Sequence, residues 1–365
     1  MKRKLRVAVI CGGKSVEHEI SLQSAKNVIE AMDREKYDIV LIGIDKDGRW
    51  HLKALADFEE EMEGSLLPHL TSRGDEVIFI PGGAGQLVNL STGERLQPVD
   101  VVFPVLHGPF GEDGAIQGLL KIAEVPFVGA GVLGSAIAMD KEVSKRLLKE
   151  AGIPAAKFLS FAREEKEEIK FPEMVSQLGL PFFVKPATLG SSVGISKVKK
   201  EEEFFSALEE AFRYDGKILI EEYVEGREIE CAVLGNEKPR ASCPGEIIPG
   251  HEFYSYEAKY IDPEGALLQI PAPLPENIAE KIQCLAIQAF RALSCEGMAR
   301  VDFFLRGEEI IVNELNTIPG FTSISMYSKL WEASGIPYPQ LIDELIQLAL
   351  ERSEKEKSLK TFINW

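Results

Sequence analysis

Short apolar runs alternate with helical patterns along the first part of the chain. Residues 5–11 (LRVAVIC) are rich in β-branched side chains, as a buried parallel strand requires. After a glycine turn, residues 15–32 place apolar side chains at helical spacing. Further apolar runs follow at residues 38–44 and 99–106. This alternation of strand and helix predicts an α/β domain built on an open parallel sheet.

The pattern weakens between residues 50 and 98. Residues 76–96 (EVIFIPGGAGQLVNLSTGERL) resemble a hairpin, because two apolar runs flank a glycine-rich turn. We assign this insert no chemistry.

Two further units follow a boundary near Met139. A basic-rich helix over 140–150 ends at the stop signal AGIP, and strands and a helix continue to about Val233. A third unit begins with a strand at 228–234 and ends in a helix at 338–352. The expected domains are residues 1–139, 140–233 and 234–365.

Composition narrows the possible partners. The 365 residues carry a net charge of −17, and so acidic a surface repels nucleic acid. The apolar run at the N-terminus is too short for a signal peptide or a membrane span, so we expect a cytoplasmic protein without a membrane partner. Scattered cysteines at no metal spacing indicate reduced thiols: Cys11, Cys231, Cys243, Cys284 and Cys295.

Two predicted strands near residues 298–304 and 309–320 carry polar side chains where apolar ones are expected. Glu314 and Asn316 are two residues apart, so they face one side of their strand, and Asp302 on the adjacent strand can reach the same point. Two carboxylates and an amide suit Mg²⁺. The other interpretation is a solvated face of a sheet, which three polar groups inside otherwise apolar strands disfavour.

Three further segments have both a functional and a plain structural interpretation. The segment FVKPATLGSSVG places Lys185 before a Gly/Ser loop whose N–H groups can hold phosphate, although it is not a P-loop and a hairpin turn is the alternative. The strand ILIEEYV carries Glu221, and Glu228 follows it; these carboxylates could bind a nucleoside. The alternative is an edge strand with an acidic solvent face. Glu17 at a helix start pairs with a substrate ammonium or only complements the helix dipole.

The order of these segments resembles the ATP-grasp carboxylate–amine ligases, and within them the D-alanine–D-alanine ligase family. The matching segments are GGKSVEHEIS, LHGPFGEDG, MDKEVSK, VKPATLGSSVG, EGREIECAVLG, FYSYEAKY, GMARVDFF and NELNTIPGFTSISMY. The resemblance covers nearly the whole chain. It implies an N-terminal sheet domain followed by a two-lobed ATP-grasp fold. It also implies ATP, two Mg²⁺ or Mn²⁺ ions and a homodimer, with two D-alanines joined through an acyl phosphate for peptidoglycan precursors.

The resemblance also assigns roles to individual residues. The expected ATP-binding residues are Lys141, Lys185, Gly190, Ser192, Glu221, Val224, Glu228 and Lys259. The expected metal ligands are Asp302, Glu314 and Asn316. The expected catalytic residues are Glu17, Ser191, Tyr260, Arg300 and Gly320, with Tyr260 on a lid over residues 251–262. The expected substrate contacts are Glu17, His107, Arg300, Ser325 and Met326.

Two other functions fit the same scaffold. A ligase with D-lactate or D-serine as second substrate would share nearly every motif, but relatives that favour lactate commonly lack the lid tyrosine, which is present here as Tyr260. A nucleotide-binding module without catalysis would have lost its metal set or its oxyanion arginine. Asp302, Glu314, Asn316 and Arg300 are all present, which disfavours that reading.

Overall fold

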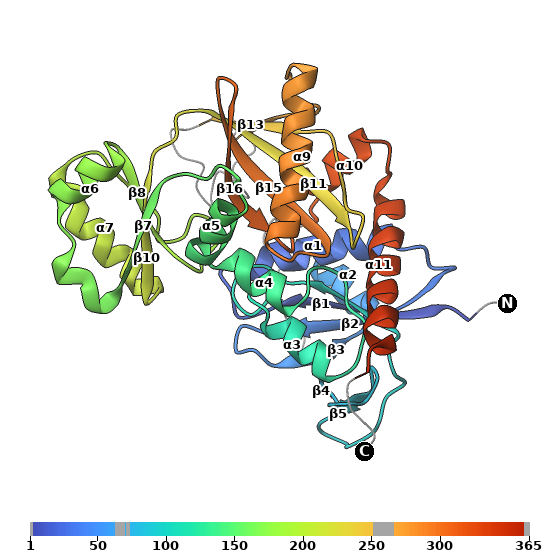
Figure 1. Ribbon diagram of the computed structural model, residues 1–365. Coiled ribbons are helices and arrows are strands. Elements are labelled where there is room, and N and C mark those ends of the chain that lie inside the picture. Colours follow the sequence, from blue (N-terminus) through green and yellow to red (C-terminus); the bar gives the residue numbers. More distant parts are fainter. Residues whose placement is uncertain (1–2, 63–69, 71–73, 251–265, 361–365) are drawn as a thin grey trace.

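The computed structural model describes residues 3–62, 70, 74–250 and 266–360. Three sheets follow one another along the chain (Figure 1). The described residues contain no helix that is both long enough and apolar enough to cross a membrane.

The N-terminal sheet has the strand order β5-β4-β3-β2-β1-β6. Its strands are β1 (Leu5–Gly12), β2 (Tyr37–Ile44), β3 (Trp50–Lys53), β4 (Asp75–Phe79), β5 (Leu87–Asn89) and β6 (Val101–Val105). The strands β2, β1 and β6 are parallel, as the apolar runs predicted, and β4 with β5 forms the predicted hairpin. The sheet extends further than predicted, because a tight turn at Asp45–Arg49 reverses the chain and adds β3 antiparallel to β2.

Alternate residues of β1 enter two different cores. Val7 and Val9 pack with α1 (His18–Ala31), whereas Ala8 and Ile10 pack on the opposite face with Ile116 of α3 (Ala115–Ile122). This alternation follows from the two-residue period of a strand covered on both faces. Helices α2 (Leu55–Glu61) and α4 (Val132–Met139) complete this domain.

The central lobe is a four-stranded antiparallel sheet in the order β7-β10-β8-β9. Its elements are β7 (Phe158–Ala162), the 3₁₀ helix η1 (Arg163–Glu168), α6 (Phe171–Leu178), β8 (Phe182–Pro186), β9 (Ser196–Val198), α7 (Glu201–Tyr214) and β10 (Lys217–Glu222). Phe182 and Phe204 meet edge to face in its core. In Figure 1 this green lobe stands apart from the other two sheets.

The C-terminal lobe has the strand order β14-β13-β11-β15-β16, with β12 beside β11. Its strands are β11 (Arg227–Gly235), β12 (Arg240–Ala241), β13 (Gly245–Pro249), β14 (Ala266–Gln269), β15 (Gly297–Arg306) and β16 (Glu309–Asn316). Its helices are α9 (Glu276–Ala292), α10 (Met326–Ala333) and α11 (Tyr338–Ser358). β11 runs through the position at which a boundary between residues 233 and 234 was expected.

One apolar core connects the first and third parts of the chain. Leu341 and Leu345 of α11 share a cluster with Val28 and Ile29 of α1 and with Trp331 of α10. Figure 1 shows α11 in red lying against the blue N-terminal sheet. The N-terminal domain and the C-terminal lobe are therefore held together by packing, and the surfaces between them are fixed in place.

Candidate active site

A cavity of about 550 Å³ lies between the N-terminal domain and the C-terminal sheet. Its volume suits a small-molecule substrate. Its wall is formed by loops of the N-terminal domain, by the Gly/Ser loop over residues 187–194 (the glycine-rich loop), by the inner face of β11, β15 and β16, and by the segment after β16. Its polar lining residues include Glu17, His107, Glu112, Ser191, Glu228, Glu230, Arg300, Asp302, Asn313, Glu314, Asn316, Thr322, Ser325 and Lys329.

The pairing of β15 with β16 brings the three expected metal ligands together. Asp302 lies opposite Glu314 in the antiparallel register, and a bulge follows Asp302. Asn316 Nδ2 donates a hydrogen bond to Asp302 Oδ2 at 2.9 Å. All three side chains line the cavity. The sequence prediction that these residues gather at one point is consistent with this geometry.

The donor chemistry of this group fits a hard divalent cation. Asp302 and Glu314 supply carboxylate oxygens and Asn316 an amide oxygen, a set that leaves coordination positions for phosphate oxygens and water. Within the described ranges, no group of three His, Cys, Asp or Glu side chains is placed to hold a metal. Because two carboxylates and one amide leave positions for phosphate oxygens, the residues suit an ion that binds together with a nucleotide.

Arg300 forms part of the same cluster. Its Nε lies 2.7 Å from Asp302 Oδ1 and 2.9 Å from Glu230 Oε2. Glu230 is a site residue that the sequence analysis missed. Its position two residues after Glu228 on β11, on the same face of the strand, was the available signal.

A second cluster surrounds Glu221, which is buried on β10. Lys185 Nζ lies 2.6 Å from one carboxylate oxygen and Lys145 Nζ lies 2.8 Å from the other. Burial alone would raise the pKa of Glu221, but the two ammonium groups outweigh it and lower the pKa. Glu221 is therefore an ionised link between two lysines, and Lys145 is a residue that sequence reasoning missed.

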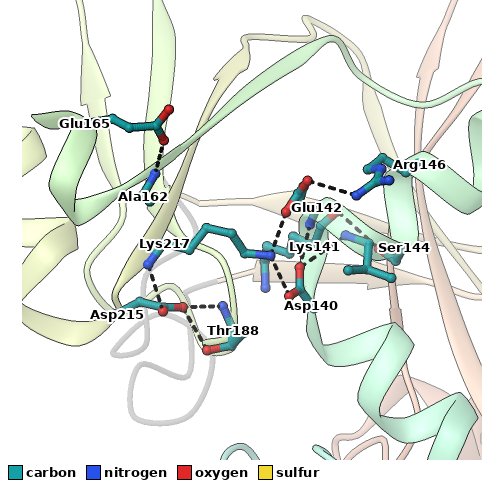
Figure 2. Close-up of polar contacts among 11 residues, drawn as sticks. Asp140, Lys141, Glu142, Ser144, Arg146, Ala162, Glu165, Thr188, Asp215 and Lys217 are labelled. Carbon is teal, nitrogen blue, oxygen red and sulfur yellow. Dashed lines mark hydrogen bonds and ion pairs between the residues drawn. The ribbon is translucent and has the colours of Figure 1, made fainter. Parts of the chain in front are cut away.

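Lys141 lies between the two clusters. It is the first residue of α5 (Lys141–Glu150), whose N-terminus is capped by the Asp140 carboxylate (Figure 2). Its Nζ donates to the Leu189 carbonyl at 2.6 Å and lies 3.5 Å from Glu314 Oε2. The loop before Gly190, the metal-ligand candidates and Lys141 are thus in contact.

Ser191 connects the glycine-rich loop to the N-terminal domain. The hydroxyl of Ser191 donates a hydrogen bond to the buried Glu17 carboxylate. Ser191 and Ser192 both have the left-handed backbone conformation, with φ of 52° and 60°. Gly190 also lines the cavity. The loop therefore forms part of one wall of the cavity, and its contact with phosphate stays a prediction.

His107 supports the wall of the cavity. Its Nδ1 lies 3.0 Å from the Ile318 carbonyl and its Nε2 lies 3.3 Å from Ser24 Oγ. Burial lowers the pKa of His107. A neutral ring with the proton on Nδ1 satisfies both contacts, because Nε2 can then accept from the serine hydroxyl. These contacts hold the segment after β16.

Glu112 was missed by the sequence analysis although it lies in LHGPFGEDG. Its carboxylate accepts the N–H groups of Gly108 at 2.9 Å and of Ile318 at 3.0 Å. Burial and the charge of Glu17 raise the pKa of Glu112 to about 7. Glu112 and His107 therefore fix the same segment from two sides.

The segment after β16 presents the remaining expected substrate contacts. Ser325 precedes α10, and its hydroxyl accepts the Thr322 N–H at 2.9 Å. A Cβ at Gly320 would lie 2.7 Å from Ser325 Oγ, so a side chain at this position would displace the serine hydroxyl. Ser325, Gly320 and the buried Met326 all line the cavity.

Some expected ATP-binding residues are not part of the described wall of the cavity: Lys141, Lys185, Ser192, Glu221 and Val224. Val224 is buried in a small apolar cluster with Ala156 and Ile311. Lys259 and Tyr260 lie outside the described residues, so their roles stay predictions.

The three sheets and these clusters define an ATP-grasp ligase. Residues 6–130 match the family described as D-ala D-ala ligase N-terminus, and residues 147–347 match D-ala D-ala ligase C-terminus. The chain belongs to the D-alanine–D-alanine ligase family.

Individual relatives agree with this assignment. A D-alanine–D-alanine ligase of Oceanobacillus iheyensis is 54% identical over 98% of both chains. The D-alanine–D-alanine ligase structure from Coxiella burnetii has a TM-score of 0.86 at 42% identity, covering 97% of this chain and 96% of that one. The VanG D-Ala:D-Ser ligase of Enterococcus faecalis has a TM-score of 0.83 at 36% identity, covering 95% of this chain and 100% of that one. A Bacillus anthracis D-alanine–D-alanine ligase complexed with ATP has a TM-score of 0.72 at 27% identity, covering 96% of this chain and 99% of that one.

Proposed function

We propose that the protein joins two D-alanines to D-alanyl-D-alanine with conversion of ATP to ADP and phosphate, supplying peptidoglycan precursor synthesis. The observation that carries the proposal is the Asp302–Glu314 pair, which lies in one cavity with Arg300 and Glu17. The family membership and the relative complexed with ATP support the use of ATP. Because ATP is a substrate, we assign the reaction to the cytoplasm.

The reaction proceeds in two displacements. A carboxylate oxygen of the first D-alanine attacks the γ-phosphorus, the bond to the β-phosphate oxygen breaks, and ADP leaves. The amine of the second D-alanine then attacks the acyl carbon, loses a proton, and inorganic phosphate departs. Two Mg²⁺ or Mn²⁺ ions, held by Asp302, Glu314 and Asn316, would supply positive charge beside the transferring phosphoryl group.

The chain's own residues bind and orient the reactants. Glu17 holds the ammonium of the first D-alanine, and Ser191 holds Glu17 in place. Arg300 and the Gly320 N–H stabilise the oxyanion that forms at the acyl carbon. Ser325 and Met326 contact the second substrate.

The nucleotide lies between the central and C-terminal lobes. Lys141 and Lys185 contact its phosphates, and the loop with Gly190 and Ser192 covers them, together with Lys259. Glu221 and Val224 border the adenine and Glu228 the ribose. His107 fixes the wall beside the first substrate through the Ile318 carbonyl. Tyr260 on the lid completes the water-excluding enclosure that an acyl phosphate requires.

A panel of substrates tests the proposal. ADP formation is measured with D-alanine alone, and then with D-alanine plus D-serine, D-lactate or L-alanine, with products identified by mass spectrometry. We expect D-alanyl-D-alanine as the main product. A dominant D-alanyl-D-serine product would instead favour the VanG-like alternative, and no ADP formation with any D-amino acid would refute the ligase proposal. Light scattering during size exclusion tests the proposed homodimer.

A further inference from the structure

Helix α5 is attached to its two neighbouring lobes by different kinds of contact. Leu148, near its C-terminus, packs with Ile282 and Phe290 of α9 in the C-terminal apolar core. Its N-terminus contacts the central lobe through charged groups and backbone hydrogen bonds (Figure 2). The placement of Lys141, the first residue of α5, therefore depends on polar contacts at the joint between two separately packed bodies.

Lys217 of β10 supplies the positive charge at the N-terminus of α5. Its Nζ lies 2.7 Å from Asp140 Oδ2 and 2.6 Å from Glu142 Oε2. The other oxygen of Asp140 accepts the N–H groups of Glu142 and Val143. The ammonium group is thus connected directly to the cap of α5, one residue before Lys141.

These ion pairs are better shielded than ordinary surface pairs. The Lys217 side chain is 29% exposed, and those of Asp140 and Glu142 are 21% and 18% exposed. The hydrogen bond from Lys217 is the largest influence on Glu142 and lowers its pKa. Burial opposes the charge of Lys217, but the bonds to both carboxylates outweigh it and raise its pKa. Lys217 and Glu142 therefore stay charged at neutral pH.

The backbone of Lys217 is also connected to Lys141, through Ala187. Its carbonyl accepts the Ala187 N–H at 3.0 Å, and the Ala187 carbonyl accepts the Lys141 N–H at 2.9 Å. Asp215, two residues before Lys217, accepts hydrogen bonds from the backbone N–H and the hydroxyl of Thr188, both at 2.8 Å. Lys217 thus holds the cap of α5 with its side chain and the start of the glycine-rich loop with its backbone.

A second bridge of opposite polarity lies further along the same pair of elements. Glu221 lies four residues after Lys217 on the same face of β10. Its Oε2 forms an ion pair with Lys145 Nζ of α5 at 2.8 Å. β10 therefore presents a cation and then an anion, while α5 presents anions and then a cation. Reversing or shifting the helix on the strand would bring like charges together, so the two bridges define one position of α5.

We propose that Lys217 is a positioning residue for ATP, which fixes Lys141 and the glycine-rich loop in one arrangement through Asp140 and Glu142. The inference rests on the proposed function, because it assigns the phosphates of ATP to Lys141. Lys217 itself is not assigned a contact with the nucleotide.

Steady-state kinetics of two variants test the proposal. Lys217→Met keeps the length of the side chain and removes its charge, whereas Lys217→Arg keeps the charge. We expect Lys217→Met to raise KM for ATP about tenfold, because Lys141 is no longer held in one position, with KM for D-alanine changed by less than about twofold. Lys217→Arg restores KM for ATP to within about threefold of wild type, because a guanidinium can bridge both carboxylates.

The matched control is Lys166→Met in the same lobe. Lys166 pairs with Glu209 at 3.3 Å between η1 and α7, outside the site. The Lys166→Met variant loses the same charge as Lys217→Met, and we expect its KM for ATP and its KM for D-alanine to equal those of wild type. An equal rise of both KM values in Lys217→Met, or none, would overturn the proposal and leave Lys217 a purely structural residue.

Two further measurements keep the test decisive. If Lys217→Met does not fold, Glu142→Gln removes one of the two ion pairs of Lys217 and is expected to show the same selective effect on ATP, weaker than about tenfold. Calorimetric titration with ADP needs no turnover, so it separates the two proposals. A wild type that forms no ADP from ATP and D-alanine would refute the ligase function, whereas equal ADP affinity in wild type and Lys217→Met would refute the role of Lys217.

Discussion

Arg300 and Asp302 form a bidentate pair of hydrogen bonds on one face of β15, with Nε 2.7 Å from Oδ1 and Nη2 2.8 Å from Oδ2. The two residues are two positions apart on a strand, so their side chains point to the same side. The planar guanidinium matches the two carboxylate oxygens. The proposed oxyanion donor and a proposed metal ligand are therefore one connected unit.

This geometry predicts the effect of Arg300→Lys. A lysine keeps the charge but cannot form the paired hydrogen bonds, so it cannot hold the same position relative to Asp302. We expect kcat to fall about 100-fold or more, the size of the loss of one oxyanion donor, while the melting temperature changes little. ADP release and thermal unfolding measure the two effects. A kcat within about tenfold of wild type would contradict the role of Arg300.

Glu314→Gln tests the metal site. The change keeps the shape of the side chain and removes the charge that faces Asp302 and Lys141. We expect ADP formation below about one hundredth of wild type and weaker Mn²⁺ binding by electron paramagnetic resonance. Glu309→Gln is the matched control, since Glu309 lies at the start of the same strand in an exposed pair with Arg306. Full turnover in Glu314→Gln would refute the assignment.

The three proposed metal ligands illustrate what a sequence can predict. Asp302, Glu314 and Asn316 lie in two strands adjacent in the chain, and the two-residue period alone decides which side chains share a face. The antiparallel pairing of β15 and β16 then places Asp302 opposite Glu314. The parallel strands of the N-terminal sheet were predictable for a different reason, because each carries a continuous apolar run.

Other features depend on contacts between distant segments. Lys145 meets Glu221 across 76 positions of the chain, and Glu112 meets Ile318 across 206. No local pattern marks these partners, although Lys145 lies one helical turn after Lys141 and so on the same face of α5. β3 was missed because four residues carry too short a pattern. Ser191 and Glu17 are 174 positions apart, and no local pattern predicts their contact either.

The buried cluster around Glu221 predicts an order of stabilities. Wild type holds two lysines and one glutamate, so Lys145→Met leaves a neutral pair of Glu221 with Lys185. Glu221→Gln instead leaves two buried ammonium groups without a counter-charge from this residue. We expect Glu221→Gln to cost about 3–5 kcal/mol of unfolding free energy and Lys145→Met clearly less. Urea denaturation of both variants measures the difference, and the reverse order would contradict the charge argument.

The pH dependence of stability tests the state of His107. Its pKa in the folded protein is lower than its ordinary value of 6.5, mainly because of burial. As pH falls through that ordinary value, the unfolded chain binds a proton that the folded chain does not. His107 therefore contributes a loss of stability on acidification, at most about 1.4 kcal/mol per pH unit. Glu112 contributes in the opposite direction, because its pKa is raised to about 7 and its protonation favours the folded state.

Comparison with His107→Asn isolates the histidine from these opposing contributions. Asparagine retains an N–H donor for the Ile318 carbonyl but does not titrate. We expect the loss of unfolding free energy between about pH 7.5 and about pH 5.5 to be smaller in His107→Asn than in wild type, whatever the absolute stability of the variant. Glu112 is present in both proteins, so its effect cancels in the difference. Parallel curves for the two proteins would mean that the folded state takes up the proton as readily as the unfolded chain, and His107 would then not be the neutral support of the cavity wall.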